Sequence, residues 1–417
     1  MSDLGSLWAD SSEEAFSAST LQGEFSVDLV ILGGGFTGCA AALEAAGQGA
    51  AVVLIEAETI GHGGSGRNVG LVNAGLWLPP DAVCNTLGAQ AGERLNSTLA
   101  TAPDRVFGLI ERFGIACNAR RNGTLHLAHA PRGFAQLEKR HAQQARRSAP
   151  VTLLDAEETR ARTGSGAFHG ALHDARAGTI QPLAYARGLA RAAQGQGARI
   201  FENSPALSAI RHGGHWVVRT SGGKLRSKAL LVATNAYHRP VGDMAIPKVP
   251  QVNFFQLATA PLGDNIARDI LPGGEGCWDT AMIMSALRRD AAGRVILGGM
   301  GDDVGIQAGW ARRKLAQLYP QLADTAITHA WAGRISMTSD HLPRILRIGA
   351  SGLSIFGYSG RGIAPGTAFG QSAARALLSG DKSALPLDPV DAHGERLTRL
   401  KTAFFETGAR MVHLMWR

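Results

Sequence analysis

The chain is 417 residues long, a length that suits about two or three closely packed domains rather than one small domain. Hydrophobic residues make up 45% of it and charged residues 18%, which excludes a largely disordered protein and indicates a sizeable core. The net charge is +8, but the basic residues are spread along the chain without a nucleic-acid-binding motif, so we expect no nucleic-acid partner.

Three further classes of protein are not indicated. No run of about 18 consecutive apolar residues is present, so we expect no transmembrane helix. The N-terminus lacks the basic start and the apolar run of a signal peptide, which predicts a cytoplasmic protein. The cysteines form no CxxC pair, so neither a disulfide framework nor a metal site is predicted; they are Cys39, Cys84, Cys117 and Cys277.

The N-terminal part of the chain reads as an arm followed by a βαβ unit. Residues 1–25 are polar with scattered apolar anchors, as in a segment that lies over the body of a protein. The apolar run 27–32 predicts a buried parallel strand, and the alanine-rich residues 39–47 favour a helix. A second apolar run at 51–56 completes the unit.

The rest of the chain alternates between helical and strand-rich stretches. Residues 81–149 predict mainly helices, with a strand at 123–129, and residues 199–236 predict a small antiparallel meander that returns to a sheet. Residues 251–300 predict strands, including a hairpin that turns at 291–293, and a helix follows at 310–322.

The C-terminal third repeats the order of elements predicted near the N-terminus, which is strand, glycine-rich turn and helix. An apolar strand is predicted at 352–358, and a glycine-rich turn and a helix at 367–380 follow it. We therefore expect the first and last thirds to join one sheet, with a second domain formed by the inserts between them.

Gly33, Gly35 and Gly38 form a G-x-G-x-x-G turn between the first strand and its helix. The first glycine allows the turn, the second admits a pyrophosphate, and the third lets helix and strand pack closely. Glu56, at the end of the next strand, can accept hydrogen bonds from a ribose diol. The motif predicts a dinucleotide site, and the alternative is a tight turn that binds nothing.

Residues 60–75, IGHGGSGRNVGLVNAG, directly follow that strand. Their glycines, with Ser65, Arg67 and Asn68, predict a backbone nest with polar arms that can hold a phosphate or the polar edge of a ring. A flexible surface loop would explain the glycines but not the apolar residues that follow at once, Val69, Leu71 and Val72.

Together these motifs resemble a known family. GGGFTG with Glu56, then GHGGSGRNVG, then GYSGRGIAPG at 357–366 are similar to the FAD-dependent D-amino-acid oxidase superfamily, which includes glycine and sarcosine oxidases. The resemblance covers residues 27–380. It implies an α/β fold with a discontinuous Rossmann-type FAD-binding domain and an inserted α+β substrate domain built on an antiparallel sheet. Within the superfamily, ARAGTIQP (175–182), CWDT (277–280), LRRD (287–290) and LKTAFFETG (400–408) most resemble the L-pipecolate oxidases.

The resemblance and the pattern of elements together predict the domain division. Residues 1–25 are the N-terminal arm and residues 386–417 a C-terminal helical segment. The FAD-binding domain takes residues 26–80, 150–244 and 334–385, and the substrate domain takes residues 81–149 and 245–333.

The resemblance also implies which residues hold FAD. The ADP half would contact Gly33, Gly35, Phe36, Thr37, Gly38, Glu56 and Ala57. The pyrophosphate and the flavin ring would contact Gly64, Ser65, Gly66, Arg67, Asn68, Gly70 and Leu71, with Ala206 near adenine and Thr234 also in the set. The pyrimidine side of the ring would lie by Gly360, Arg361, Gly362 and Ile363. Asn68 stands where some relatives carry a histidine joined to FAD, so we expect noncovalent binding.

On the substrate side, the catalytic candidates are Tyr358, Arg288 and His62. The Tyr358 hydroxyl is predicted to orient an amine or a carboxylate; Arg288 is alternatively a solvated hairpin residue, and His62 a loop cap. An apolar wall could come from Phe254, Phe255, Met282, Met284 and Trp331, of which we select Phe255, Met282 and Trp331 as the substrate pocket. The alternative is that these side chains belong to the core.

One departure from the family concerns the carboxylate clamp. WAG at 331–333 is similar to glycine oxidase, but Arg334-Ile335-Ser336 follows here instead of Leu-Arg-Pro. A displacement by one residue turns a side chain to the opposite face of a strand. We therefore do not expect Arg334 to act as the usual clamp.

These features predict an FAD-dependent oxidoreductase that converts a small secondary amine or amino acid to the imine, with L-pipecolate as the leading substrate and piperideine-6-carboxylate as its product. Oxygen or a quinone-linked carrier would accept the electrons. The alternatives are a γ-glutamylputrescine oxidase and a noncatalytic flavoprotein subunit. Residues 397–417 carry apolar residues at helical spacing between basic ones, so they are predicted to dock internally or, alternatively, to associate weakly with the inner face of the membrane.

Overall fold

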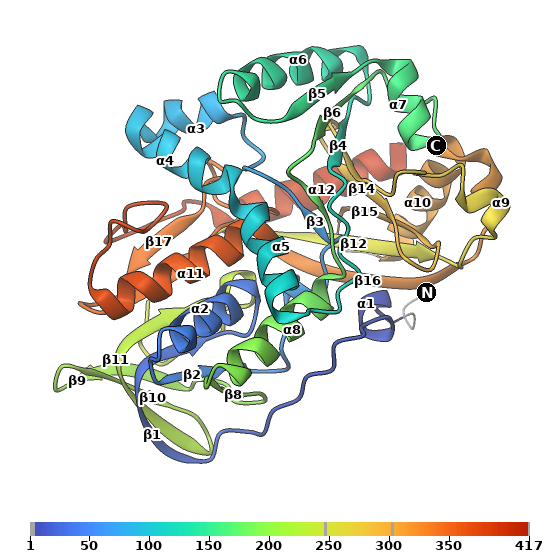
Figure 1. Ribbon diagram of the computed structural model, residues 1–417. Coiled ribbons are helices and arrows are strands. Elements are labelled where there is room, and N and C mark those ends of the chain that lie inside the picture. The colour runs from blue at the N-terminus through green and yellow to red at the C-terminus, as the bar shows by residue number, and fades with distance from the viewer. Residues whose placement is uncertain (1–4, 246–247, 302–303, 416–417) are drawn as a thin grey trace.

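The computed structural model describes residues 5–245, 248–301 and 304–415, which form two large sheets (Figure 1). The first sheet has the order β17 (Arg344–Arg347), β18 (Gly352–Phe356), β11 (Gly223–Val232), β1 (Gly23–Leu32), β2 (Val52–Ile55) and β8 (Arg199–Phe201). All of these except β17 run parallel, so their carboxyl ends meet at one edge. The prediction that the first and last thirds share a Rossmann-type sheet is confirmed.

Helices cover one face of this sheet and a hairpin covers the other (Figure 1). Small residues allow close helix packing: a Cβ at Gly370 would lie 2.2 Å from the carbonyl oxygen of Thr37. The hairpin of β9 (Ser208–His212) and β10 (His215–Arg219) pairs with β11 and buries Trp216 on the opposite side. The covering helices are α2 (Phe36–Gly47), α5 (Ala102–Phe113), α8 (Pro182–Gly195) and α11 (Ile363–Ser379).

The second sheet has the order β16 (Ile327–Ser336), β12 (Gln251–Thr259), β15 (Val295–Met300), β14 (Ser285–Arg289), β13 (Gly276–Asp279), β4 (Thr124–Leu127), β6 (Ala171–Asp174) and β5 (Val151–Leu154). Its pairs are antiparallel apart from β13 with β4. Trp310 of α10 (Val304–Leu318) packs against Phe255 of this sheet, with ring centroids 5.8 Å apart. The predicted antiparallel sheet and the 291–293 hairpin turn are thus confirmed.

Two strands lie elsewhere than the predicted domain division would put them. β5 and β6 fall in the stretch 150–244, which was assigned with the first sheet, but they pair with β4 in the second. Strand β16 also runs across the predicted boundary at 333 and 334. A short apolar run indicates a strand without indicating its partner, because pairing is decided by contacts far away in the sequence. The division of the chain into domains therefore stays a prediction.

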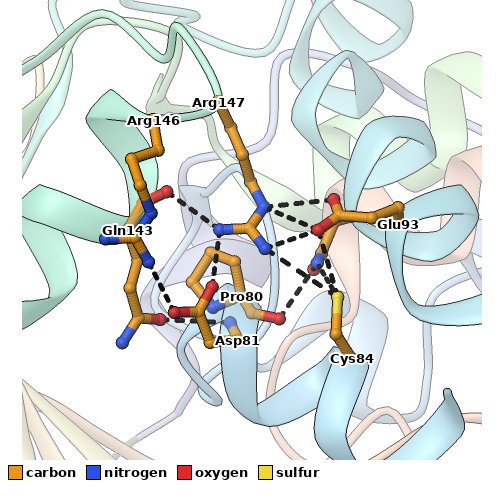
Figure 2. A network of polar contacts seen from close by, with 8 residues as sticks. Pro80, Asp81, Cys84, Glu93, Gln143, Arg146 and Arg147 are labelled. Carbon is orange, nitrogen blue, oxygen red and sulfur yellow. Dashed lines mark hydrogen bonds and ion pairs between the residues drawn. The ribbon is translucent and has the colours of Figure 1, made fainter. Parts of the chain in front are cut away.

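A group of helices beside the second sheet is tied together by an ion-pair network (Figure 2). Arg147, just beyond α6 (Pro131–Ala145), donates to Asp81 of α3 (Pro80–Leu87) at 2.7 Å and to Glu93 of α4 (Ala89–Ala100) at 3.1 Å. Arg147 also donates to the Cys84 sulfur, while burial and Glu93 raise the pKa of that thiol. The network holds α3 in position. Trp77, which belongs to the site described below, lies three residues before the start of α3.

The described part of the N-terminal arm, which starts at residue 5, lies along the body, as predicted. Its short helix α1 (Leu7–Asp10) buries Leu7 and Trp8, and Glu14 accepts hydrogen bonds from the backbone of Ala116 at 2.8 Å and from Arg191 at 2.8 and 2.9 Å. The remaining elements are β3 (Leu71–Val72), which pairs with β7 (Gly178–Thr179), and the helices α7 (Ala156–Thr163) and α9 (Asp264–Ala267).

The C-terminal helix α12 (Thr398–Met415) docks on the second sheet. Thr402 and Glu406 accept hydrogen bonds from the backbone N–H groups of Gln251 at 3.1 Å and Asn253 at 2.9 Å. The buried His413 packs on Trp310, with ring centroids 4.4 Å apart. Internal docking of this segment is therefore confirmed for residues up to 415. None of the described helices combines the length and the apolar character needed to cross a membrane.

Candidate active site and cofactor cradle

A cavity of about 600 Å³ lies at the carboxyl ends of the parallel strands. Leu32, Ile55 and Ala233, at or beyond the ends of β1, β2 and β11, line its floor. Phe254, Trp278 and Met284 line it from the side of the second sheet. In open α/β sheets ligands bind at this edge, so one ligand could contact both sheets.

The first glycine turn is shaped for close approach of a ligand. Gly33 has a φ of +107°, and a Cβ at Gly38 would lie only 1.9 Å from the carbonyl oxygen of Gly33, so neither position accommodates a side chain without a shift. Helix α2 begins directly after this turn, at Phe36. The N–H of Phe36 donates to Ser65 Oγ at 3.1 Å, and Gly35, Phe36 and Thr37 line the cavity. The N-terminus of α2 thus lies at the cavity wall, where the helix dipole favours a phosphate.

Glu56 is held in place at the end of β2. One carboxylate oxygen accepts the backbone N–H of Gly34 at 2.6 Å, and the other accepts that of Glu58 at 3.0 Å. The side chain lines the cavity with Ala57, next to the glycine turn. A fixed carboxylate with free lone pairs at this point can accept hydrogen bonds from ribose hydroxyls.

The polar arms of the loop 60–75 fold back on the loop itself. Asn68 donates to the carbonyl oxygens of Gly64 and Ser65, both at 2.9 Å, and accepts the N–H of Gly70 at 2.9 Å. Arg67 donates to the carbonyl oxygen of His62 at 2.7 Å. The loop is thus preorganised by its own side chains. The N–H groups of Gly66 and Asn68 bond to the carbonyl oxygens of Gly63 and Gly64, both at 3.2 Å, so the predicted backbone nest stays a prediction for the rest of the loop.

The second glycine turn meets the first through Tyr358. Its hydroxyl lies 2.8 Å from Thr37 Oγ1 on α2, and burial raises the pKa of Tyr358, which keeps the phenol neutral. Ser359 and Gly360 follow with φ values of +49° and +89°, and α11 then starts at Ile363 with its N-terminus at the cavity. Because the hydroxyl is bonded to Thr37, it joins the two halves of the cradle. Tyr358 also lines the cavity, so its predicted role in orienting an amine or a carboxylate stays a prediction.

These features fit an FAD. The N-termini of α2 and α11, the positive-φ Gly33 and the carboxylate of Glu56 all line this one cavity. Most of the predicted cofactor residues line the cavity, but Gly38, Gly66, Arg67 and Gly70 do not. A Cβ on Gly66 would lie 2.3 Å from the carbonyl oxygen of Gly61, and one on Gly70 would lie 2.2 Å from that of Ile180, so these glycines serve the packing behind the cradle.

The three residues selected for the substrate pocket do not line the cavity. Phe255 is fully buried in the core on the opposite side of β12, while its neighbour Phe254 faces the cavity. Trp331 donates its indole N–H to the carbonyl oxygen of Arg67 at 2.8 Å, behind the loop. Met282 is 84% exposed, whereas Met284 lines the wall. These selections were wrong. For Phe255 and Trp331 the sequence does not tell which face of the strand turns to the cavity, and Met282 lies in the segment between β13 and β14, outside both strands.

Of the other two catalytic candidates, Arg288 lies behind the cavity wall and His62 lines it. Arg288 is buried and donates to the carbonyl oxygens of Val69 at 3.2 Å and Ile180 at 2.6 Å, so it supports the loop 60–75 from behind. Burial lowers the pKa of Arg288 to about 10. His62 lies at the exposed rim of the cavity, edge-on to Tyr237 with ring centroids 6.5 Å apart.

Two tryptophans of the wall were not among the predicted site residues. Trp77 and Trp278 both line the cavity, with ring centroids 6.2 Å apart. Trp278 belongs to CWDT, and Trp77 is the second residue after the loop 60–75. Their closeness in the sequence to these two motifs was the only indication that they belong to the site.

Comparison with known proteins agrees with this geometry. Residues 28–376 match the family model of the FAD dependent oxidoreductases. The chain belongs to this family. A probable oxidoreductase OrdL of Rhizobium meliloti is 32% identical over 353 residues, which cover 82% of this chain and 81% of that protein. The γ-glutamylputrescine oxidoreductase of Escherichia coli K12 is 30% identical over 373 residues, or 86% and 85% of the two chains.

Solved structures of similar fold include glycine oxidase from Geobacillus kaustophilus, with a TM-score of 0.73 and 20% identity over 88% of this chain and 100% of that one. The L-proline dehydrogenase from P. horikoshii has a TM-score of 0.71 and 19% identity over 89% and 98%. The family assignment establishes an FAD-dependent oxidoreductase. The predicted fold class and cofactor are confirmed with it.

Proposed function

We propose that this FAD-dependent oxidoreductase oxidises a small amino acid with an apolar side or ring, and that L-pipecolate is its leading substrate. The observation that carries the proposal is the charge distribution on the cavity wall. Among the described wall residues only Glu56 and Glu58 are acidic, and both lie at the nucleotide end, where Glu58 pairs with Arg239. The wall formed by Phe254, Met284 and Trp278 carries no anion for a substrate cation.

The chemistry requires a two-electron acceptor next to the substrate. When bound, FAD supplies that acceptor for a hydride from the carbon beside the substrate nitrogen. The nitrogen lone pair forms the new C=N bond, the N–H proton leaves to solvent, and oxygen or a quinone-linked carrier takes up the two electrons in turn. The chain contributes binding, orientation and exclusion of water; Tyr358 is a neutral phenol and supplies no base.

The rival substrate is γ-glutamylputrescine, because one relative at 30% identity carries that name. Its reacting end is a primary amine without a neighbouring carboxylate. Such an ammonium group would enter a wall without acidic side chains among its described residues, which disfavours it here.

We further propose that α12 rests on an anionic membrane surface, where a quinone-linked carrier is available. Leu397, Leu400, Phe404, Met411 and Leu414 are 49–75% exposed and recur at helical spacing along one face. Exposed Arg396 and Arg399 lie beside this stripe in a chain of net charge +8. Apolar side chains flanked by arginines suit the boundary of an anionic bilayer.

The deciding experiment is anaerobic mixing of the purified holoenzyme with L-pipecolate, L-proline, sarcosine, glycine, D-alanine or γ-glutamylputrescine, while the visible absorbance of oxidised flavin is followed. We expect L-pipecolate to bleach the flavin first and fastest. Bleaching by γ-glutamylputrescine alone would transfer the assignment to the rival. If none of the compounds bleaches the flavin, the substrate proposal fails while the family assignment stands.

A further inference from the structure

A short loop, residues 280–284, joins β13 to β14 and forms part of the cavity wall. Trp278 before the loop, Met284 within it and Ala286 after it all line the cavity. Met282, in the middle of the loop, is 84% exposed. The position of the wall on this side therefore depends on how the 280–284 loop is held.

Both ends of the 280–284 loop are bonded to one carboxylate. Asp279, the last residue of β13 and 3% exposed, accepts the N–H groups of Ala281 and Ser285 through Oδ1, both at 3.1 Å. Its Oδ2 accepts the hydroxyl of Ser285. The backbone pairing of β13 with β14 reaches only as far as Trp278 and Ala286. A charged side chain thus closes the loop where the backbone ladder stops.

The carboxylate is in turn anchored to two other elements of the protein. Lys314 of α10 is 7% exposed, and its Nζ lies 3.7 Å from Asp279 Oδ2. The next residue, Thr280, donates its N–H to the carbonyl oxygen of Leu127 at 3.0 Å, and its hydroxyl lies 2.7 Å from His129 Nδ1. The start of the loop is therefore fixed by α10 and by the end of β4.

The groups that fix the loop lie behind the cavity wall. Asp279, Ser285 and Lys314 do not line the cavity, whereas Met284 does. A molecule bound in the cavity can therefore leave these bonds as they are. Methionine has three rotatable bonds, so a wall that contains Met284 has a defined shape only if its backbone is held in place.

We propose that Asp279 is a positioning residue: paired with Lys314, it holds the 280–284 loop so that Met284 lies in the wall against which the substrate packs. The inference rests on the proposed function, because it assigns this wall to the substrate. It also gives the acidic residue of the CWDT motif (277–280) a role that the cofactor cradle does not explain.

The first test follows the loop itself and needs no substrate. Dilute hydrogen peroxide transfers one oxygen atom to a methionine sulfur and is reduced to water. Tandem mass spectrometry of the tryptic peptide 269–288 from the FAD-loaded enzyme separates Met282 from Met284. In the wild type we expect the exposed Met282 to be oxidised faster. Asp279→Asn should raise the oxidation rate of Met284 relative to Met282 by about fivefold, since the half-buried Met284 is then released.

The second test follows the substrate side. The concentration dependence of anaerobic flavin reduction gives the apparent Kd of L-pipecolate and the limiting rate. We expect the apparent Kd to rise about tenfold in Asp279→Asn, because a displaced wall no longer orients the substrate. The FAD content, measured by flavin absorbance, should stay that of the wild type.

The matched control is Glu275→Gln, at the other end of β13. Glu275 is 4% exposed, pairs with Arg162 at 2.9 Å and does not line the cavity. This variant loses a comparable ion pair, so its melting temperature should fall as that of Asp279→Asn does. Its Met284 oxidation and its apparent Kd should stay those of the wild type.

The assignment is overturned if Asp279→Asn keeps the wild-type oxidation rate of Met284 or the wild-type Kd, or if Glu275→Gln shows the same changes. If Asp279→Asn does not fold, Ser285→Ala decides, because it removes the hydroxyl bond and keeps the ion pair; its changes should be smaller and of the same sign. If L-pipecolate leaves the wild-type flavin oxidised, the proposed substrate fails, while the oxidation rates still decide whether Asp279 holds the wall.

Discussion

Glu56 is the residue through which the sequence motif and the structure agree most directly. It holds the N–H of Gly34 at 2.6 Å and keeps its lone pairs on the cavity side. Glu56→Leu should weaken FAD binding by about 10- to 100-fold, since one charged hydrogen-bond acceptor is worth roughly 1.5–3 kcal/mol. Fluorescence titration of the apoprotein with FAD measures the change.

The matched control is Glu44→Leu, on the outer side of α2, where the carboxylate pairs with Arg375 at 3.0 Å and does not line the cavity. It should keep the FAD affinity of the wild type. A Glu56→Leu protein that purifies with a full complement of flavin would remove the ribose role from this residue.

Sequence reasoning did not tell which of two neighbouring side chains of the same type lines the cavity. Phe254 and Phe255 are both phenylalanines of β12, and Met282 and Met284 are both methionines of the segment before β14, yet only Phe254 and Met284 line the cavity. Which phenylalanine faces the cavity is set by the register of β12 with neighbouring strands, which is a non-local contact. The glycine turns were predictable because their steric requirement is local. A φ of +107°, as at Gly33, strongly favours glycine, so the residue type itself indicates the turn.

At the scale of elements, α12 shows how one helix serves two surfaces. Its inner face contacts β12 through Thr402 and Glu406, and its outer face carries the exposed apolar stripe. The spacing of apolar residues predicted an amphipathic helix, but apolar residues lie on both faces, so the pattern did not tell which face would be covered.

The outer stripe leads to a prediction on membrane binding. The double variant Leu400→Ser with Phe404→Ser should bind phosphatidylglycerol vesicles at least about tenfold more weakly, since each side chain loses roughly 1.5–3 kcal/mol of apolar burial. Co-sedimentation with vesicles measures it. Ile210→Ser, which removes a 53% exposed residue of β9, is the control and should bind as the wild type does. Equal sedimentation of both variants would exclude α12 as the contact.

At the scale of the whole molecule, distant parts of the chain converge on the loop 60–75. Trp8 of the N-terminal arm donates to the carbonyl oxygen of Asn68 at 2.8 Å, Trp331 of the second sheet donates to that of Arg67 at 2.8 Å, and Arg288 binds that of Val69 at 3.2 Å. The loop itself was recognisable from its residues, whereas these supports come from three separate regions and leave no local pattern. Cradle and substrate wall are therefore coupled through a single loop.

This coupling predicts that the arm contributes to FAD affinity without lining the cavity. Trp8→Phe keeps an aromatic ring but replaces the buried indole by a smaller one without its N–H, so it should lower the free energy of unfolding by at least about 1 kcal/mol and weaken FAD binding about fivefold by releasing the loop. Trp216→Phe loses a comparable bond, to the carbonyl oxygen of Ser351 at 3.3 Å, on the far face of the first sheet. That control should lose similar stability while its FAD affinity stays that of the wild type. Calorimetric melting and FAD titration separate the two effects, and equal FAD affinity in both variants would show that the arm stabilises the fold alone.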